Sequence, residues 1–132
     1  MIPCPECRGP LAAVEHRGVE LDVCPAGHGR WWDRDELRML VERSGGDALA
    51  GLEAELAALP ASRTGRPCPR CDRPMELVRP EANDAPWLDR CPAGHGLWFD
   101  PGELAALLAA RLDGDALVSV RDYLADFLEP AP

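Results

Sequence analysis

Cysteine and histidine recur in this chain at spacings that can hold a metal ion. Each of two sets begins with a Cys-x2-Cys pair and ends, one hairpin's length later, with a Cys-x3-His pair. The sets are Cys4, Cys7, Cys24 and His28, then Cys68, Cys71, Cys91 and His95. Paired ligands separated by a hairpin-sized gap are typical of two turns that grip one ion. Three thiolates and one imidazole suit tetrahedral Zn²⁺, so the sequence predicts two structural zinc ions per chain.

These cysteines have two alternative uses, in an iron site or in disulfides. Iron is the alternative metal, although a rubredoxin-like site would take four cysteines. Six cysteines could instead form three disulfides. The N-terminus has neither the basic nor the apolar stretch of a signal peptide, and the cytosol keeps thiols reduced. We therefore expect a cytoplasmic protein and favour metal over disulfides.

A site with four protein ligands leaves no open position on the ion. Hydrolytic zinc sites use three protein ligands and bind water at the fourth position. Elsewhere, Ser44, Ser62 and Ser119 have no adjacent histidine, and the carboxylates fit helix caps and solvated faces. The sequence thus predicts structural zinc, no catalytic residues, no other cofactor and no enzymatic activity.

An internal repeat carries both ligand sets. The segment Cys24–Asp33 recurs, with two substitutions, as Cys91–Asp100. The offset between the copies is 64 residues at the first cysteine pair and 67 at the second, so the second copy contains three inserted residues. We expect a first copy over residues 1–59, an exposed linker over 60–67 and a second copy over 68–132.

Short hairpins precede the helices in each copy. Residues 19–23 alternate between apolar and polar, which indicates a half-buried strand. Residues 11–15 are its predicted partner, and 75–79 and 87–90 are the equivalents in the second copy. The sequence predicts a small, metal-stabilised α+β fold of two tandem zinc ribbons (short β-hairpins), each followed by two α-helices.

Helix starts are marked in both copies. Asp33 with Glu36 has the spacing of a capping box, and so does Asp100 with Glu103. Pro101 suits a first helical position. A second helix follows each first one, after the breaks at residues 45–47 and 113–115.

The second helices have one apolar face each. The residues on these faces are Leu49, Leu52, Leu56 and Leu59 in the first copy, and Leu117, Val120, Leu124 and Phe127 or Leu128 in the second. We expect these faces to pack within the chain; a homodimer or partner-helix seam is the alternative.

The aromatic residues cluster between the last ligand and the first helix. We expect Trp31, Trp32, Trp98 and Phe99 to form core rather than a platform for stacking bases. His16 matches neither ligand set and is expected to be an exposed turn residue.

The chain resembles the bacterial transcription-factor-IIB-type zinc-ribbon family over both ribbons. The matching residues are Cys4, Cys7, Cys24, Gly29, Trp31, Asp33, Glu36 and Leu37, then Cys68, Cys71, Cys91, Gly96, Trp98, Asp100, Gly102, Glu103 and Leu104. In both copies a glycine (Gly27 or Gly94) stands where the family has its fourth cysteine, and a histidine follows. The resemblance implies a zinc-ribbon fold; a link with transcription is an analogy.

The charge balance limits the classes of partner. The chain has 14 arginines, no lysine and 23 acidic residues, for a formal charge of −9. Such a chain is a poor binder of nucleic acid or anionic membranes, and no apolar run is long enough to span a bilayer. We favour an interaction module for a protein partner of unknown identity. One alternative is a nucleic-acid-binding or transcription-associated protein that uses Arg63, Arg66, Arg70 and Arg73; the other is a metal or thiol-redox sensor.

Overall fold

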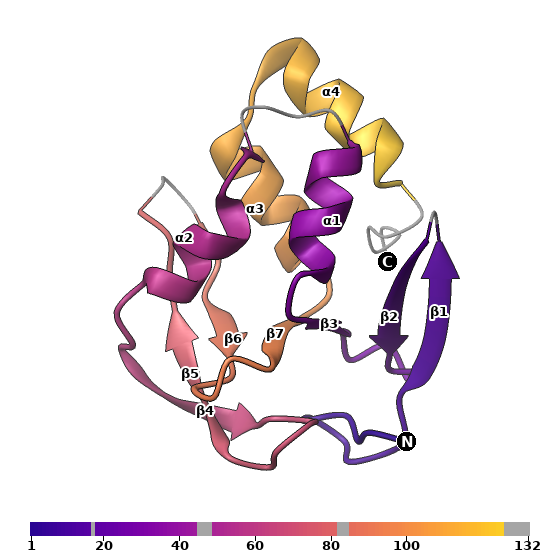
Figure 1. Cartoon of the computed structure of the whole chain (residues 1–132), viewed down its shortest axis with the longest axis vertical. Helices are drawn as coiled ribbons and strands as arrows, with labels where there is room; N and C mark the ends of the chain where they lie inside the picture. Colours follow the sequence, from indigo (N-terminus) through magenta and orange to yellow (C-terminus); the bar gives the residue numbers. More distant parts are fainter. Residues whose placement is uncertain (17, 45–48, 82–84, 126–132) are drawn as a thin grey trace.

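The computed structural model describes all residues except 17, 45–48, 82–84 and 126–132. Its strands are β1 (Ala12–His16), β2 (Val19–Val23), β3 (Arg30–Asp33), β4 (Arg63–Pro67), β5 (Pro74–Val78), β6 (Leu88–Arg90) and β7 (Gly96–Phe99). Its helices are α1 (Glu36–Arg43), α2 (Leu52–Ala58), α3 (Glu103–Arg111) and α4 (Gly114–Tyr123). The strands form one antiparallel sheet in the order β1-β2-β3-β7-β6-β5-β4. The helices gather at the end of the molecule opposite the N-terminus (Figure 1).

The two copies meet at the centre of the sheet, where β3 pairs with β7. This pairing places Trp31 opposite Trp98, and the two tryptophans are equivalent positions of the repeat. A residue that pairs with its own equivalent lies on an approximate two-fold axis. The same axis exchanges the two flanking pairs, which are Arg30 with Phe99 and Trp32 with Leu97. The two ribbons are therefore halves of one sheet.

Glycines make this close junction possible. Gly29 precedes β3 with φ +144°, and Gly96 begins β7 with φ +156°. A Cβ atom on Gly29 would overlap the carbonyl oxygen of Phe99, and one on Gly96 would overlap the carbonyl oxygen of Trp32. Only glycine leaves room for the opposite strand at these two points.

Alternation along β3 and β7 sends neighbouring aromatic side chains to opposite faces. Trp31 and Trp98 pack with cysteines of both ligand sets. Trp32 and Phe99 lie in the other cluster, beneath the helices, with an edge-to-face contact at 6.2 Å between ring centroids. All four rings are buried. The prediction that they form core is confirmed, and burial excludes them as a platform for bases.

The apolar faces of the second helices are buried within the chain. The buried residues are Leu49, Leu52, Leu56, Val120 and Leu124, with Leu59 and Leu117 partly buried against the same core. Phe127 and Leu128 lie outside the described residues. Among the residues described, this packing agrees with the prediction that the apolar faces are internal.

The two hairpins form where the alternating pattern predicts them, but three strands were not predicted. β3 and β7 come from segments that the sequence suggested only as aromatic core. The segment 60–67, expected to be an exposed linker, contains β4, which pairs with β5. β3 and β7 pair with each other across the two copies, and β4 pairs with β5. The residues of a single segment do not show that such a distant partner exists, so these strands could not be predicted from the local pattern.

The capping prediction is half right. The backbone N–H of Asp33 donates to Glu36 Oε1 at 2.7 Å, as a capping box requires, and Asp100 does the same to Glu103 at 2.6 Å. The helices nevertheless begin later than predicted, at Glu36 and Glu103. Their N-cap residues are Asp35 and Gly102, both in the left-handed conformation.

The aspartates are drawn away from the helix ends by other partners. Asp33 accepts a hydrogen bond from the indole of Trp31 at 2.8 Å, and Asp100 accepts one from Trp98 at 3.1 Å. Pro101 lies before α3 and is not its first residue. The predicted cap at residues 45–47 lies outside the described residues, whereas Asp113 is the N-cap residue of α4.

Within the described ranges, none of the helices is both long and apolar enough to cross a membrane.

Candidate metal centres

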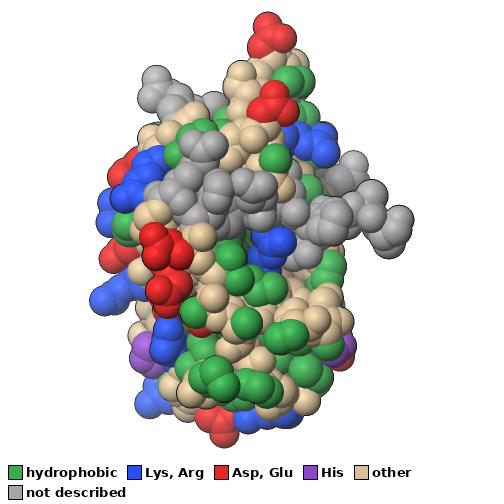
Figure 2. Space-filling view, turned by 90° about the vertical axis from the view of Figure 1, so that its right-hand side faces the viewer, with side chains coloured by type: hydrophobic (Ala, Val, Ile, Leu, Met, Phe, Trp, Pro, Cys, Tyr) green, Lys and Arg blue, Asp and Glu red, His purple; other side chains and the backbone are tan. Residues whose placement is uncertain are grey.

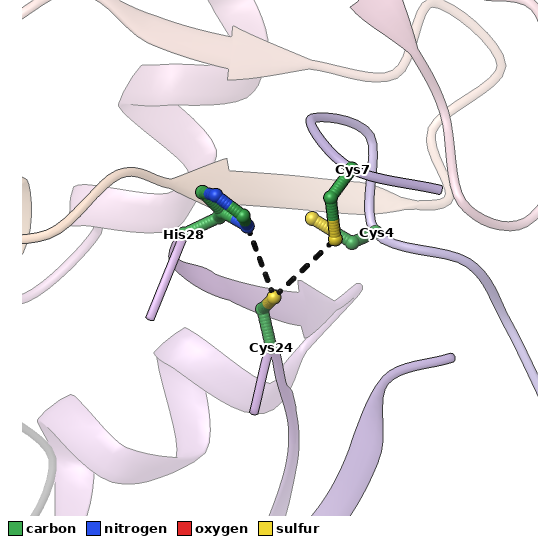
Figure 3. A group of neighbouring side chains, drawn as sticks. All are labelled: Cys4, Cys7, Cys24 and His28. Carbon is green, nitrogen blue, oxygen red and sulfur yellow. Dashed lines mark hydrogen bonds between the residues drawn. The ribbon is translucent and has the colours of Figure 1, made fainter. Parts of the chain in front are cut away.

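The first centre lies between two turns of the first copy (Figure 3). Cys4 and Cys7 come from the turn before β1, and Cys24 and His28 come from the turn between β2 and β3. The Sγ atom of Cys24 is 3.8 Å from that of Cys7 and 3.3 Å from His28 Nδ1. The four potential ligand atoms all lie within 4.8 Å of one another.

The second centre repeats this geometry. Cys68 and Cys71 precede β5, and Cys91 and His95 lie between β6 and β7. The Sγ atom of Cys91 is 3.7 Å from that of Cys71 and 3.3 Å from His95 Nδ1. The donor atoms again lie within 4.8 Å of one another. The structure thus brings the eight predicted ligands together as two groups of four.

The spacing of these atoms fits Zn²⁺. With Zn–S bonds of about 2.3 Å and Zn–N bonds of about 2.0 Å, a regular tetrahedron has S···S edges of about 3.8 Å and S···N edges of about 3.5 Å. The observed S···S separations are 3.8 and 3.7 Å, and both S···N separations are 3.3 Å. A disulfide needs sulfurs about 2.0 Å apart, and all six cysteines are free. The two Cys3His sites are therefore compatible with two structural Zn²⁺ ions, each of which would cross-link the two turns of its ribbon.

Backbone N–H groups are aimed at the sulfurs of both first cysteines. The N–H of Glu6 donates to Cys4 Sγ at 3.3 Å, and that of Arg70 donates to Cys68 Sγ at 3.3 Å. Such hydrogen bonds offset part of the negative charge of a thiolate. They result from the tight Cys-Pro-x-Cys turn, and so they occur in both copies.

Glycine allows the second turn of each centre to close. Gly27 and Gly94 have φ values of +85° and +80°, a region that residues with a Cβ rarely adopt. The N–H of Gly27 donates to the carbonyl of Cys24 at 3.0 Å, and that of Gly94 donates to Cys91 at 3.1 Å. The glycine that replaces the family's fourth cysteine therefore shapes the turn that presents the histidine.

Burial and hydrogen bonding affect the thiols in opposite directions. Burial raises the pKa of Cys68 to about 12 and raises the pKa of Cys4 as well. Burial also acts on Cys24, but hydrogen bonds from the backbone and ring of His28 and from the backbone of Ala26 outweigh it and lower the pKa to about 6. A divalent cation would favour the thiolate at every one of these positions. The buried thiols of Cys4 and Cys68 therefore depend on a cation to hold a thiolate charge, whereas the thiol of Cys24 ionises more readily.

The two centres share one apolar surrounding. Trp31 and Trp98 lie in a single cluster with Leu11, Met75 and buried cysteines from both sites. This cluster spans the approximate two-fold axis, since Trp31 and Trp98 pair across it. Residues of both metal centres therefore pack into one buried cluster in the middle of the sheet.

An ion pair from the second copy stabilises the first. Arg70, in the turn between Cys68 and Cys71, donates to both carboxylate oxygens of Asp33 at 2.8 and 2.6 Å. Its guanidinium also lies 3.8 Å from Asp22. This bidentate contact joins one metal turn to the start of the other copy's helix.

The symmetric contact is impossible, because the residue equivalent to Arg70 is Glu6. Glu6 faces Asp100, and the guanidinium of Arg66 from β4 lies between the two carboxylates. Arg66 donates to Glu6 at 3.0 Å and to both oxygens of Asp100 at 2.9 Å. It also donates to Asp89 at 2.8 Å, the one charged residue that is fully buried among those described.

A third ion pair crosses the axis directly. Arg8 donates to Asp72 at 3.1 Å, and these two residues are equivalent positions of the repeat. The sequence does not predict this network, because Arg63, Arg66, Arg70 and Arg73 suggest only a solvated charge cluster or phosphate contacts. An alternation of sign at equivalent positions, as in Glu6 and Arg70, is the signal that could have revealed it. His16 was predicted to be an exposed turn residue, but it is the last residue of β1 and pairs with Val19; its side chain lies outside the described part, so its exposure stays a prediction.

Comparison with known families agrees with this geometry. The model of the TFIIB-type zinc ribbon, described as a transcription factor zinc-finger, matches residues 3–43 and 67–110. The two matches cover both metal centres and well over half of the chain. Searches of curated proteins and of solved structures found no match.

Proposed function

Because this chain belongs to the TFIIB-type zinc-ribbon family, we propose that it is a non-enzymatic, zinc-stabilised module that binds a protein partner. The observation that carries the proposal is the closed donor set. Each centre offers four protein ligands at tetrahedral spacing, which fill the coordination of Zn²⁺ and leave no position for a substrate or water. The ions then serve to hold surfaces in place.

The use of the arginines supports a protein partner over a polyphosphate. Arg66 and Arg70 are engaged with carboxylates of the same chain. These two guanidinium groups are therefore not free to bind phosphates, and the chain as a whole carries a formal charge of −9. Such a surface favours neutral or basic protein partners and repels nucleic acid.

Site-specific photo-crosslinking tests this proposal. A photoreactive amino acid is placed singly at the exposed positions Val14, Trp87 and Val118 of the full chain, and adducts formed in the producing cells are identified by mass spectrometry. We expect a reproducible protein adduct at one face and none at the others. Adducts to nucleic acid alone, or no protein adduct at any of the three positions, would contradict a protein-binding role.

Nucleic-acid binding is the second candidate function, favoured by one specific feature. Trp87 is 38% exposed, and the guanidinium groups of Arg63 and Arg79 lie 5.6 and 5.7 Å from its ring centroid. An exposed aromatic ring flanked by arginines is a surface on which a base could stack.

Fluorescence anisotropy with labelled single-stranded DNA and RNA at low salt separates the two candidates. A nucleic-acid binder should show affinity that falls steeply with salt and is lost in Trp87→Ala. Val118→Ala, which changes an exposed residue on α4, is the control. Flat titrations for the unmodified chain would remove this candidate.

A further inference from the structure

A pocket lies between α2 and the turn of the second metal centre, and residues of both copies line it. Its volume is about 200 Å³. The apolar part of the lining consists of Trp32, Ala57, Pro92 and Leu97. Trp32 and Leu97 are only 1% and 5% exposed and lie deep, whereas Ala57 and Pro92 are exposed and lie at the rim.

The size of this pocket suits a single side chain. A cavity of about 150 Å³ holds one benzene molecule, whereas pockets for cofactors and drug-sized ligands have volumes of about 300–1,000 Å³. A pocket of about 200 Å³ therefore has room for one aromatic ring and its methylene group. Aromatic side chains that enter such pockets supply much of the binding energy at protein interfaces.

The carboxylates that line the pocket already have partners. Glu53 accepts two backbone N–H groups at the start of α1, at 2.8 and 3.1 Å. Glu76 pairs with Arg90 at 2.5 Å, and Asp33 pairs with Arg70. Because these negative charges are compensated within the chain, they do not call for a cation from outside.

Arg34 is the lining cation that remains. Its side chain is exposed, and within the part of the chain that the structure describes it makes no ion pair. A Cβ atom at Gly94 would lie 4.0 Å from Arg34 Nη1, so the guanidinium lies over the metal turn. The backbone N–H of Arg34 donates to the carbonyl of His95 at 2.9 Å, which fixes this position. A guanidinium beside an apolar pocket favours an occupant that carries a carboxylate next to its apolar group.

The walls of the pocket are held in place before anything binds. Arg90 donates to the carbonyls of Leu56, Ala57 and Leu59, at 2.9, 3.2 and 2.6 Å, and so ties the end of α2 to β6. The opposite wall is the turn 91–96, which carries two ligands of the second metal centre. A preformed pocket binds its occupant without the entropy cost of ordering the site.

The lining is specific to one copy of the repeat. The residues equivalent to Arg34 and Leu97 in the other copy are Pro101 and Arg30. The equivalent place therefore lacks the rim cation and has a long charged side chain where this pocket has leucine. The apolar pocket with its arginine is consequently not a by-product of the zinc-ribbon fold.

We propose that this pocket binds an aromatic side chain of a protein partner, whose neighbouring carboxylate pairs with Arg34. This inference rests on the proposed protein-binding function and names its site and the chemistry of its anchor. The partner needs only one carboxylate at this point, so the rest of its surface can be neutral or basic, as the charge of the chain favours.

A small acid provides the probe. 3-Phenylpropanoate carries a phenyl ring and a carboxylate, and 3-phenylpropanamide has the same shape without the charge. Each is titrated into the isotope-labelled, zinc-loaded full chain, and binding is followed by the NMR shifts of the backbone amides. We expect saturable binding of the acid in the millimolar range, with the largest shifts at Arg34, Gly94 and Leu97. The amide should bind about threefold more weakly, and butanoate, which lacks the ring, should give no saturable shifts.

Variants with matched controls locate the site. Ala57→Phe places a ring at the rim and should abolish binding of the acid, whereas Ala58→Phe adds the same ring at the next exposed position, outside the lining, and should not. Arg34→Ala should remove the preference for the acid over the amide, which a merely structural role of Arg34 would leave unchanged. Arg121→Ala, at an exposed position on α4, is its control.

Several outcomes would overturn the inference. These are no saturable shifts at tens of millimolar acid, shifts centred away from the pocket, unchanged binding by Ala57→Phe, or equal binding of acid and amide to the unmodified chain. Micromolar binding of the free acid would also overturn it, since a small molecule would then be the occupant. A protein adduct at Val14, Trp87 or Val118 that forms equally well in Ala57→Phe would leave the proposed function standing and reject only this site.

Discussion

The two copies of the repeat have almost the same metal centres and very different surroundings. Both place a Cys3His set at the same S···S and S···N separations. Around them, Arg70 binds Asp33 directly, whereas Glu6 and Asp100 need Arg66 between them. Among the described strands, β4 extends the sheet beyond β5 on one side, whereas β1, the equivalent of β5, is outermost on the other. The metal geometry is conserved between the copies because it depends on a few bond lengths, while the surrounding charged residues differ and find different partners.

The largest effect that we expect is from loss of a zinc ligand. Cys24→Ser and Cys91→Ser remove equivalent ligands from the two centres. A structural zinc contributes about 10–16 kcal/mol of binding energy, which is comparable with the whole stability of a small domain, about 5–15 kcal/mol. Each variant should lose at least one zinc, as read by native mass spectrometry.

Because both centres share one buried cluster, each loss should also unfold the opposite copy. Hydrogen exchange at β7 in Cys24→Ser, and at β3 in Cys91→Ser, measures this spread. Protection that survives in the unmutated copy would show that the ribbons are independent units. Ser44→Ala, at a position away from both centres, is the control.

Replacing the two inter-copy arginines should have unequal effects. Arg66→Ala leaves Asp89 buried and unpaired, with Glu6 and Asp100 facing each other, and should lower the free energy of unfolding by about 3–5 kcal/mol. Arg70→Ala should cost about 1 kcal/mol, since Asp33 is 31% exposed and water can replace its partner. Chemical denaturation of both variants with zinc present provides the comparison.

Equal losses in the two arginine variants would mean that the Arg66 network is no more than a surface ion pair. Arg38→Ala, whose partners Asp35 and Glu42 are exposed, controls for the loss of any arginine and should change stability less than either of the other two substitutions.

Crowding at the β3–β7 junction should be more costly than strain alone. Gly29→Ala and Gly96→Ala add a Cβ that overlaps a carbonyl of the opposite strand and should each cost about 2–4 kcal/mol, from strain plus overpacking. Gly27→Ala, two residues away at φ +85° with open space around it, should cost only about 1–2 kcal/mol. The three variants are compared by their thermal unfolding midpoints. If Gly27→Ala lowered the midpoint most, the overlap at the β3–β7 junction would not be the costly feature.

The smallest effect concerns the two half-buried glutamates at the helix starts. Burial, followed by neighbouring carboxylates, raises the pKa of Glu103 to about 8 and that of Glu36 to about 7. A raised carboxyl pKa means that the folded state binds the proton more tightly than the unfolded state does. The stability from this proton is complete below the ordinary pKa of 4.5 and is lost as pH rises through 7 for Glu36 and through 8 for Glu103.

Glutamine substitutions isolate this dependence. Relative to the unmodified chain, Glu103→Gln should gain up to about 1 kcal/mol for each pH unit between 6 and 8, because the amide keeps an acceptor for the N–H of Asp100 and does not titrate. Glu36→Gln should gain less over the same range. Denaturation at saturating zinc keeps metal loss out of the comparison. If the variant and the unmodified chain showed the same dependence of stability on pH, the raised pKa of the glutamate would be wrong.

Sequence pattern alone located most of the candidate site and about half of the sheet. The eight donors, the two β-hairpins and the buried aromatics could be predicted, because spacing, alternation and amino-acid type act over a few residues. The strands β3, β4 and β7 could not. Each depends on a partner that lies far away in the chain, and nothing in the local pattern of Trp31 or Arg63 distinguishes a strand from a loop.

The amino-acid sequence by itself determined the two metal centres of this protein. Bond lengths to a metal allow few arrangements of Cys-x2-Cys and Cys-x3-His, and so the donor sets follow from the spacing. The tertiary structure alone decided how the two ribbons are joined. The pairing of Trp31 with Trp98 and the use of Arg66 by three carboxylates depend on contacts between residues 23 to 67 positions apart in the chain. Such contacts are chosen by the packing of the whole chain.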